Sequence, residues 1–167
     1  FRLDGIDAID FSGYSVSSAG DVNGDGFDDM IIGERMADPG GGDSREGESY
    51  VVFGKSSGFP AAVDLSTLDG TNGFRLDGID AGDFSGISVS SAGDVNGDGF
   101  DDLIIGALHA DPGGDSSAGE SYVVVGTLGE FSEAAKLSTM AGAIGCRLRE
   151  RDRDIISCNL VSKGGDG

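Results

Sequence analysis

Short apolar segments recur along the chain and are separated by turns rich in glycine and aspartate. Residues 29–32 and 49–53 carry contiguous rather than alternating apolar side chains, which is typical of strands covered on both faces. Residues 15–19 are almost all small, and a fourth strand is expected at residues 74–76. No amphipathic stretch is long enough for a helix, so the pattern predicts an all-β fold with four strands per unit.

The chain repeats itself at an interval of 73 residues. Residues 1–41 and 74–114 agree at 35 of 41 positions, and beyond a one-residue deletion the offset becomes 72. At that offset residues 131–148 resemble residues 59–76. We therefore expect two full repeats, residues 1–73 and 74–145, and a degenerate partial third, residues 146–167, in one structural unit.

Strands that are apolar on both faces need a sheet stacked on each side. Four-stranded sheets stacked in this way form the blades of a β-propeller. A closed propeller has about four to eight blades, whereas this chain has two and a fragment. We therefore expect open faces at both ends, which other copies or flanking repeats would cover through head-to-tail association.

One nine-residue segment, DVNGDGFDD, occurs at residues 21–29 and again at residues 94–102. Oxygen ligands at its positions 1, 3, 5 and 9, a backbone carbonyl at position 7 and a glycine at position 6 would form a cage for a hard cation. The predicted ligands are Asp21, Asn23, Asp25, Phe27 and Asp29 in the first copy and Asp94, Asn96, Asp98, Phe100 and Asp102 in the second.

These segments differ from the EF-hand, whose loop ends in an acidic residue at position 12 and lies between two helices. Position 12 is Ile32 in the first copy and Ile105 in the second, and strands are expected on both sides. Mg²⁺ releases its water reluctantly, so Ca²⁺ is the favoured ion. The sequence thus predicts two Ca²⁺ ions per chain, each in a β-hairpin loop.

Charge is distributed unevenly. Residues 1–127 hold 24 Asp and Glu against 5 Lys and Arg, and residues 128–167 hold 6 of each, which accounts for the net charge of −19. The acidic part would be repelled by nucleic acid and by anionic membranes. Extracellular modules bind calcium loosely, at concentrations of about 10⁻⁴–10⁻³ M, so we expect a secreted or cell-surface protein without membrane insertion.

The C-terminal part contains both cysteines, Cys146 and Cys158. In an extracellular protein a single disulfide between them is favoured over free thiols. The sequence RLRERDRD lies between them, and in an extended strand its arginines would share one face. That row is either a solvated edge or a contact with the acidic body of another copy.

The residues also resemble the FG-GAP repeats of integrin α-subunit propellers. The resemblance rests on FSG at residues 11–13 and 84–86, on the Asp-x-Asn-x-Asp-Gly-x-x-Asp loop, and on the glycine after each apolar strand. Gly106-Ala107-Leu108 approaches the Gly-Ala-Pro of the family, whereas Gly33-Glu34-Arg35 departs from it. The resemblance implies a β-propeller with calcium in its hairpin loops, and a role in extracellular adhesion or ligand binding.

Catalysis is not expected. His109 is the only histidine, and it replaces Met36 of the first repeat, so no repeated chemistry uses it. The favoured function is a calcium-binding adhesive or self-assembling module with a possible protein or glycan ligand. The alternatives are a non-catalytic propeller segment of a larger secreted or surface protein, and a calcium-stabilised lectin. The absence of Trp weakens the lectin alternative, because sugars commonly stack on aromatic rings.

Overall fold

The computed structural model describes residues 1–129 and 131–139, and the backbone alone of residues 145–149. This part of the chain is all β, as predicted, with three short 3₁₀ turns and no α-helix. The strands are β1 (Arg2–Asp4), β2 (Ser15–Gly20), β3 (Asp29–Glu34), β4 (Glu48–Val52), β5 (Ala62–Asp64), β6 (Gly73–Asp77), β7 (Ser85–Gly93), β8 (Asp102–Ala107), β9 (Glu120–Val124), β10 (Ala134–Lys136) and β11 (Gly145–Arg149). The turns are η1 (Leu65–Thr67), η2 (Pro112–Gly114) and η3 (Leu137–Thr139).

The first sheet has the order β10-β6-β4-β3-β2. Its four antiparallel strands β2, β3, β4 and β6 are the four that the apolar pattern predicts. Successive side chains alternate between faces, so Ile31 lies on one face and Ile32 on the other, and they are 0% and 4% exposed. Both faces are therefore covered, as the contiguous apolar runs indicate. The fifth strand, β10, was not expected; it joins the outer edge in parallel with β6.

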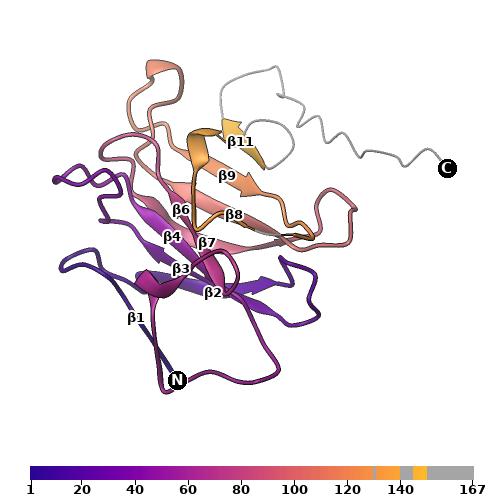
Figure 1. Ribbon diagram of the computed structural model, residues 1–167. Coiled ribbons are helices and arrows are strands. Elements are labelled where there is room, and N and C mark those ends of the chain that lie inside the picture. Colours follow the sequence, from indigo (N-terminus) through magenta and orange to yellow (C-terminus); the bar gives the residue numbers. More distant parts are fainter. Residues whose placement is uncertain (130, 140–144, 150–167) are drawn as a thin grey trace.

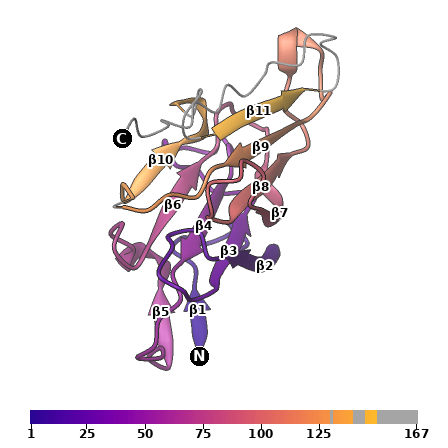
Figure 2. The ribbon, with the colours of Figure 1, turned by 90° about the vertical axis from the view of Figure 1, so that its right-hand side faces the viewer.

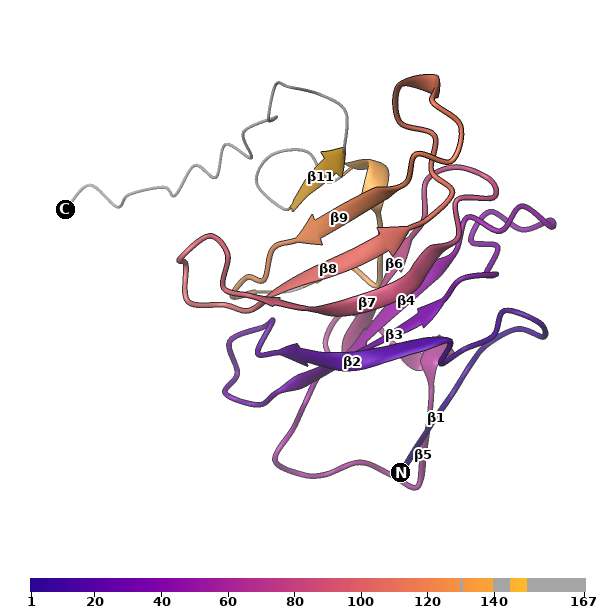
Figure 3. The ribbon, with the colours of Figure 1, turned by 180° about the vertical axis from the view of Figure 1, so that it is seen from behind.

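The second sheet has the order β11-β9-β8-β7 and packs face to face on the first. Figures 1 and 3 show β2 of the first sheet beside β7 of the second. Apolar side chains of both sheets fill the space between them in one cluster: Ala19, Val22, Ile31, Val51, Phe53, Phe74, Leu76, Leu103, Ile105, Ala107, Ala110, Tyr122, Val124 and Leu137. This layer is the main core of the described residues.

A smaller apolar cluster covers the opposite face of the first sheet. There Ile32, Tyr50 and Val52 pack against Leu65 and Leu68, which belong to and follow η1. The short strand β5 precedes η1 and pairs in parallel with β1. The same unit recurs 72 residues later, where β10 and η3 follow each other and β10 pairs in parallel with β6. Figure 2 shows both parallel pairs. The predicted likeness of residues 131–139 to the preceding repeat is thus visible in the fold.

Residues 44–47 of the first repeat form hydrogen bonds with residues 78–85, at the start of the second repeat. Gly78 donates its backbone N–H to the Gly47 carbonyl (2.8 Å), Gly82 donates to Ser44 (2.7 Å) and Ser85 donates to Glu46 (2.9 Å). Gly47 has φ +82°, and a β-carbon there would lie 2.1 Å from the Ser85 carbonyl oxygen. Only glycine allows this approach. The connection fixes the second sheet against the first.

Two expectations fall on residues that the structure does not describe. Cys158 and most of the RLRERDRD segment lie among residues 150–167. The Cys146–Cys158 disulfide and the arginine row therefore stay predictions. Within the described residues, no helix has the length and apolar character needed to span a membrane.

Candidate metal centre

The two acidic loops lie at the tips of equivalent hairpins, between β2 and β3 and between β7 and β8. Figure 1 shows both tips at the same edge of the molecule, at the right of that view. Because the two sheets stack, the loops follow one another from sheet to sheet. The prediction that each loop closes a β-hairpin is therefore confirmed, whereas its occupancy by a metal ion stays a prediction.

In the first loop, side-chain oxygens fold back onto the backbone. Asp21 accepts N–H groups of Gly24 (2.8 Å) and Asp25 (3.1 Å) at Oδ1, and that of Gly26 (2.9 Å) at Oδ2. Asn23 Oδ1 accepts from Asp25 N (2.9 Å). Gly24 and Gly26 have φ of +74° and +87°, values that glycine adopts without strain. The glycines thus let the loop curl around the side chains of its own first residues.

The second loop has the same network. Asp94 accepts from Gly97 (2.7 Å), Asp98 (3.1 Å) and Gly99 (2.9 Å), and these bonds hold the pKa of Asp94 below its usual value. Asn96 Oδ1 accepts from Asp98 N at 2.8 Å. Two loops in different surroundings therefore adopt one hydrogen-bonding pattern, which their shared sequence determines.

The ninth residue of each loop is buried where the following strand begins. Asp29 is 1% exposed, and its two oxygens accept N–H groups of Val22 (3.0 Å) and Gly54 (2.8 Å). Burial raises the pKa of Asp29 to about 6 despite these hydrogen bonds, and the charges of Asp25 and Asp21 add to the rise. Asp102, which is 0% exposed, is held in the same way by Val95 and Gly126.

The donor chemistry of each tip fits a hard cation. Three carboxylates and one amide oxygen come from one loop, and no ion pair within the described residues involves them. A buried carboxylate beside two others is stabilised by a positive charge. In this structure the carboxylates are held by backbone N–H groups, and within the described part of the chain no three acidic, His or Cys side chains are grouped as a metal site.

The loop of the first repeat is also joined to that of the second. Asp101 Oδ2 accepts the backbone N–H of Asp21 (2.9 Å), and Asp101 N donates to the Asp21 carbonyl (3.1 Å). The Phe100 ring covers Gly24, where a β-carbon would lie 2.3 Å from it. The counterpart of Asp101 in the first repeat, Asp28, is exposed. Both residues stand in the same sequence, GDGFDD, so no local signal distinguishes them.

Comparisons with known proteins place these loops in a family. The family model described as "FG-GAP repeat" matches residues 12–52 and 85–124. The first match covers strands β2, β3 and β4, and the second covers β7, β8 and β9. Integrin alpha-PS2 of Drosophila melanogaster is 34% identical over 117 residues, which are 68% of this chain and 8% of that protein. Integrin alpha-5 of Xenopus laevis is 31% identical over 109 residues, which are 65% of this chain and 10% of that protein.

Integrin alpha pat-2 of Caenorhabditis elegans is 32% identical over 97 residues, which are 57% of this chain and 7% of that protein. The chain therefore spans a tenth or less of the length of these curated relatives. The residues matched by the family model include three strands of each sheet and both acidic loops. The chain is an FG-GAP repeat protein of the integrin-alpha type.

Proposed function

We propose that this chain is a calcium-binding FG-GAP module that acts outside the cell or at its surface, in adhesion or assembly rather than in catalysis. The observation that carries this proposal is the identical fold of the two hairpin tips, each with three carboxylates and an amide oxygen. Asp21, Asn23, Asp25 and Asp29 would hold one ion, with Asp94, Asn96, Asp98 and Asp102 holding the second. The carbonyls of Phe27 and Phe100 complete the proposed ligand sets.

Bound calcium would supply positive charge where acidic side chains otherwise repel one another. Ligand binding to the folded state alone raises stability by about 1.4 kcal/mol per site when free calcium is ten times the dissociation constant. Thermal unfolding with calcium and with a chelator tests this. The expected result is a melting temperature several degrees higher in millimolar calcium, and equal melting temperatures in both buffers would contradict the proposal.

The assembly role rests on two faces that lack a neighbour within the described residues. Val16 is 66% exposed, whereas its counterpart Val89 packs into the core between the sheets. Val95 is 55% exposed, whereas its counterpart Val22 is 0% exposed. Each exposed valine thus marks a surface that the other repeat buries. We propose that a further repeat of the same kind covers these faces.

Another copy of the chain or flanking repeats of a longer protein could supply that repeat. One observation favours flanking repeats: β1 corresponds to β6, the fourth strand of the first sheet, yet among the described strands it pairs with β5 alone. Sedimentation in calcium over a range of concentrations separates the two. Head-to-tail association that Val16→Glu abolishes and Ser57→Glu preserves would support self-assembly. A compact monomer at high concentration would leave only the flanking repeats.

A further inference from the structure

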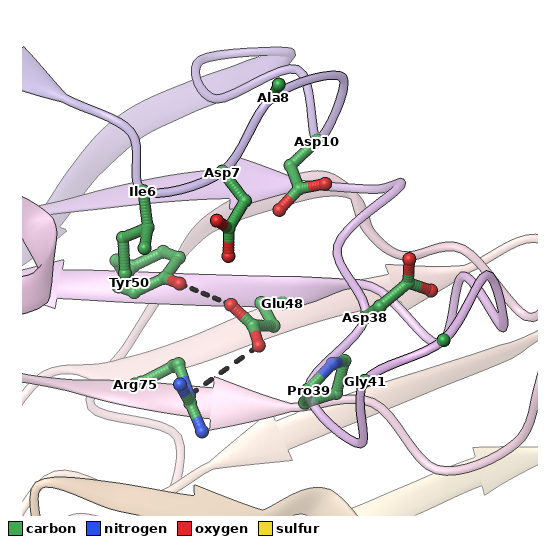
Figure 4. A pocket seen from close by; sticks show the side chains of 11 residues that line it. Ile6, Asp7, Ala8, Asp10, Asp38, Pro39, Gly41, Glu48, Tyr50 and Arg75 are labelled. Atoms are coloured by element: carbon green, nitrogen blue, oxygen red, sulfur yellow. Dashed lines mark hydrogen bonds and ion pairs between the residues drawn. The ribbon is translucent and has the colours of Figure 1, made fainter.

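The end of the molecule opposite the loop tips contains an acidic hollow of about 460 Å³. Figure 4 shows Asp7, Asp10, Asp38 and Glu48 arranged around it, with Tyr50 and Arg75 beside Glu48. The aspartates come from the loops that follow β1 and β3, whereas Glu48 lies on β4. This hollow is separate from the predicted calcium loops.

A row of buried carboxylates lies beneath these loops. Glu34 is the cross-strand neighbour of Glu48, and Glu48 is the cross-strand neighbour of Asp77. Residues directly opposite one another share a face of the sheet, so all three side chains lie on the face that carries the hollow. They are 0%, 5% and 5% exposed, respectively. Charged side chains are rarely buried to this extent without a partner.

Arg75 is the only base among the residues that line the hollow, and it is already engaged. Its Nε and Nη2 donate to the two oxygens of Asp77 at 2.6 and 3.3 Å, while Glu48 Oε1 lies 3.7 Å from Nε. Glu48 Oε2 accepts the Tyr50 hydroxyl. Four carboxyl groups therefore line the hollow, those of Asp7, Asp10, Asp38 and Glu48. Two more, those of Glu34 and Asp77, lie beneath it and form its floor, and Arg75 contacts only Asp77 and Glu48 of these six.

Glu34 has no ion-pair partner among the described residues. Both of its carboxylate oxygens are buried without a hydrogen bond, and Oε1 lies 3.3 Å from the position of a β-carbon on Gly5, directly under the loop of Asp7 and Asp10. Burial raises the pKa of Glu34, and Asp10 and Asp7 add to the rise. The Ser12 hydroxyl opposes this shift, although it makes no hydrogen bond of ordinary geometry. A positive charge placed beside this buried carboxyl group would favour its ionised form.

We propose that the hollow binds an organic cation, namely an ammonium or guanidinium group carried on an alkyl chain. The carboxyl groups that line the hollow come from three separate segments: the loop after β1, the loop after β3 and strand β4. Spread carboxylates suit a ligand with several N–H donors. Ile6, Pro39 and the Tyr50 ring also line the hollow and offer apolar contact to an alkyl chain.

The second repeat lacks two members of this floor. Ala107 stands where the first repeat has Glu34, and Arg149 stands where it has Asp77. The four acidic residues that line the hollow do have acidic counterparts in the second repeat, namely Asp80, Asp83, Asp111 and Glu120. We therefore expect the site in the first repeat only, although residues 1–41 and 74–114 agree at 35 of 41 positions.

Calorimetric titration with spermidine, in millimolar calcium and physiological salt, tests the proposal on the whole chain. The expected result is one saturable site that Glu34→Gln weakens about tenfold. Asp69→Asn, which removes an exposed charge elsewhere, is the matched control and should bind as the natural chain does. If Glu34→Gln fails to fold, Asp10→Asn in the exposed loop replaces it. A short lysine-containing peptide, titrated in parallel, shows whether the cation is a free amine or a protein side chain.

Three results would overturn the proposal. Equal weakening by Glu34→Gln and Asp69→Asn would mean that spermidine is attracted only by the net charge. The absence of saturable binding by both spermidine and the peptide would exclude an organic cation. A third calcium ion that is lost in Glu34→Gln and displaces spermidine would identify the hollow as a metal site instead.

Discussion

The carboxylate of Asp101 in the second repeat accepts the backbone N–H of Asp21, the first residue of the other repeat's acidic loop, at 2.9 Å. The two residues are joined a second time through Asp101 N and the Asp21 carbonyl. A side chain beside one predicted metal site thus positions the backbone of the other. In the equivalent place of the first repeat, Asp28 is exposed to solvent.

Asp101→Ala should therefore destabilise the chain, whereas Asp28→Ala should not. Loss of a hydrogen bond to a charged acceptor costs about 1–2 kcal/mol in free energy of unfolding, and exposed substitutions usually change it by less than about 0.5 kcal/mol. Urea unfolding in a chelator measures both variants without a contribution from calcium. Equal destabilisation by the two substitutions would show that the Asp101–Asp21 contact contributes nothing particular.

Ile9 has an unfavourable backbone conformation that its counterpart tolerates. Its φ is +79° and its side chain is 75% exposed, whereas Gly82 has φ +85°. The left-handed region costs an L-residue about 1–2 kcal/mol, and the greater freedom of glycine in the unfolded chain offsets part of that cost.

Ile9→Gly should consequently raise the free energy of unfolding by about 0.5–1 kcal/mol. The reverse change, Gly82→Ile, should lower it, although a β-carbon at Gly82 meets no atom within 4 Å. Thermal unfolding of the two variants checks both signs. A loss of stability in Ile9→Gly would imply that the exposed side chain of Ile9 makes a contact that outweighs the strain.

Phe74 stacks on Phe131, with ring centroids 4.5 Å apart and an interplanar angle of 5°, and is 2% exposed. Phe74→Ala should cost about 3–5 kcal/mol, as expected for a buried phenylalanine. Phe1 is its counterpart in the sequence repeat, and it stacks on Phe59 while 64% exposed. Phe1→Ala should cost less than about 1 kcal/mol. Similar costs for both, measured by denaturant unfolding, would contradict the described burial.

Burial raises the pKa of Glu48 to about 7; Asp77 and Glu34 also raise it, while Tyr50 and Arg75 oppose the rise. The native state then retains a proton that the unfolded chain has lost between pH 4.5 and 7. The contribution of Glu48 to the free energy of unfolding is therefore complete below pH 4.5 and is lost as the pH rises through 7. Asp29 and Asp83, with pKa values of about 6, act in the same direction.

Glu48→Gln should flatten this decline in chelator-containing buffer, while Asp43→Asn, which removes an exposed charge, should leave the slope nearly unchanged. Melting temperatures between pH 4.5 and 8 give the comparison. A Glu48→Gln profile parallel to that of the natural chain would mean that Glu48 does not carry the pH dependence.

The four antiparallel strands of the first sheet can be predicted from the sequence, because the local pattern of side chains determines them. Contiguous apolar residues predict β3 and β4, and small residues predict β2. The acidic loop between β2 and β3 is predicted by the spacing of its aspartates and glycines. The observed β2, β3 and β6 extend the predicted strands by one or two residues, whereas β4 begins and ends one residue earlier than predicted. Duplication adds to this, because the second sheet repeats the pairing of the first.

The remaining features depend on neighbours that a local pattern does not reveal. Asp28 and Asp101 have the same flanking residues, and only the presence of another repeat separates their roles. The addition of β10 to β6 joins segments almost 60 residues apart. The floor of Glu34, Glu48 and Asp77 arises only when three strands come into register.

The central claim, that each hairpin tip binds one calcium ion, is tested most directly by native mass spectrometry of the chain in calcium and after chelation. We predict two ions per chain in calcium, none after chelation, and one in Asp25→Asn or Asp98→Asn. An ion-free chain in millimolar calcium, or a count of two that neither substitution changes, would contradict the account.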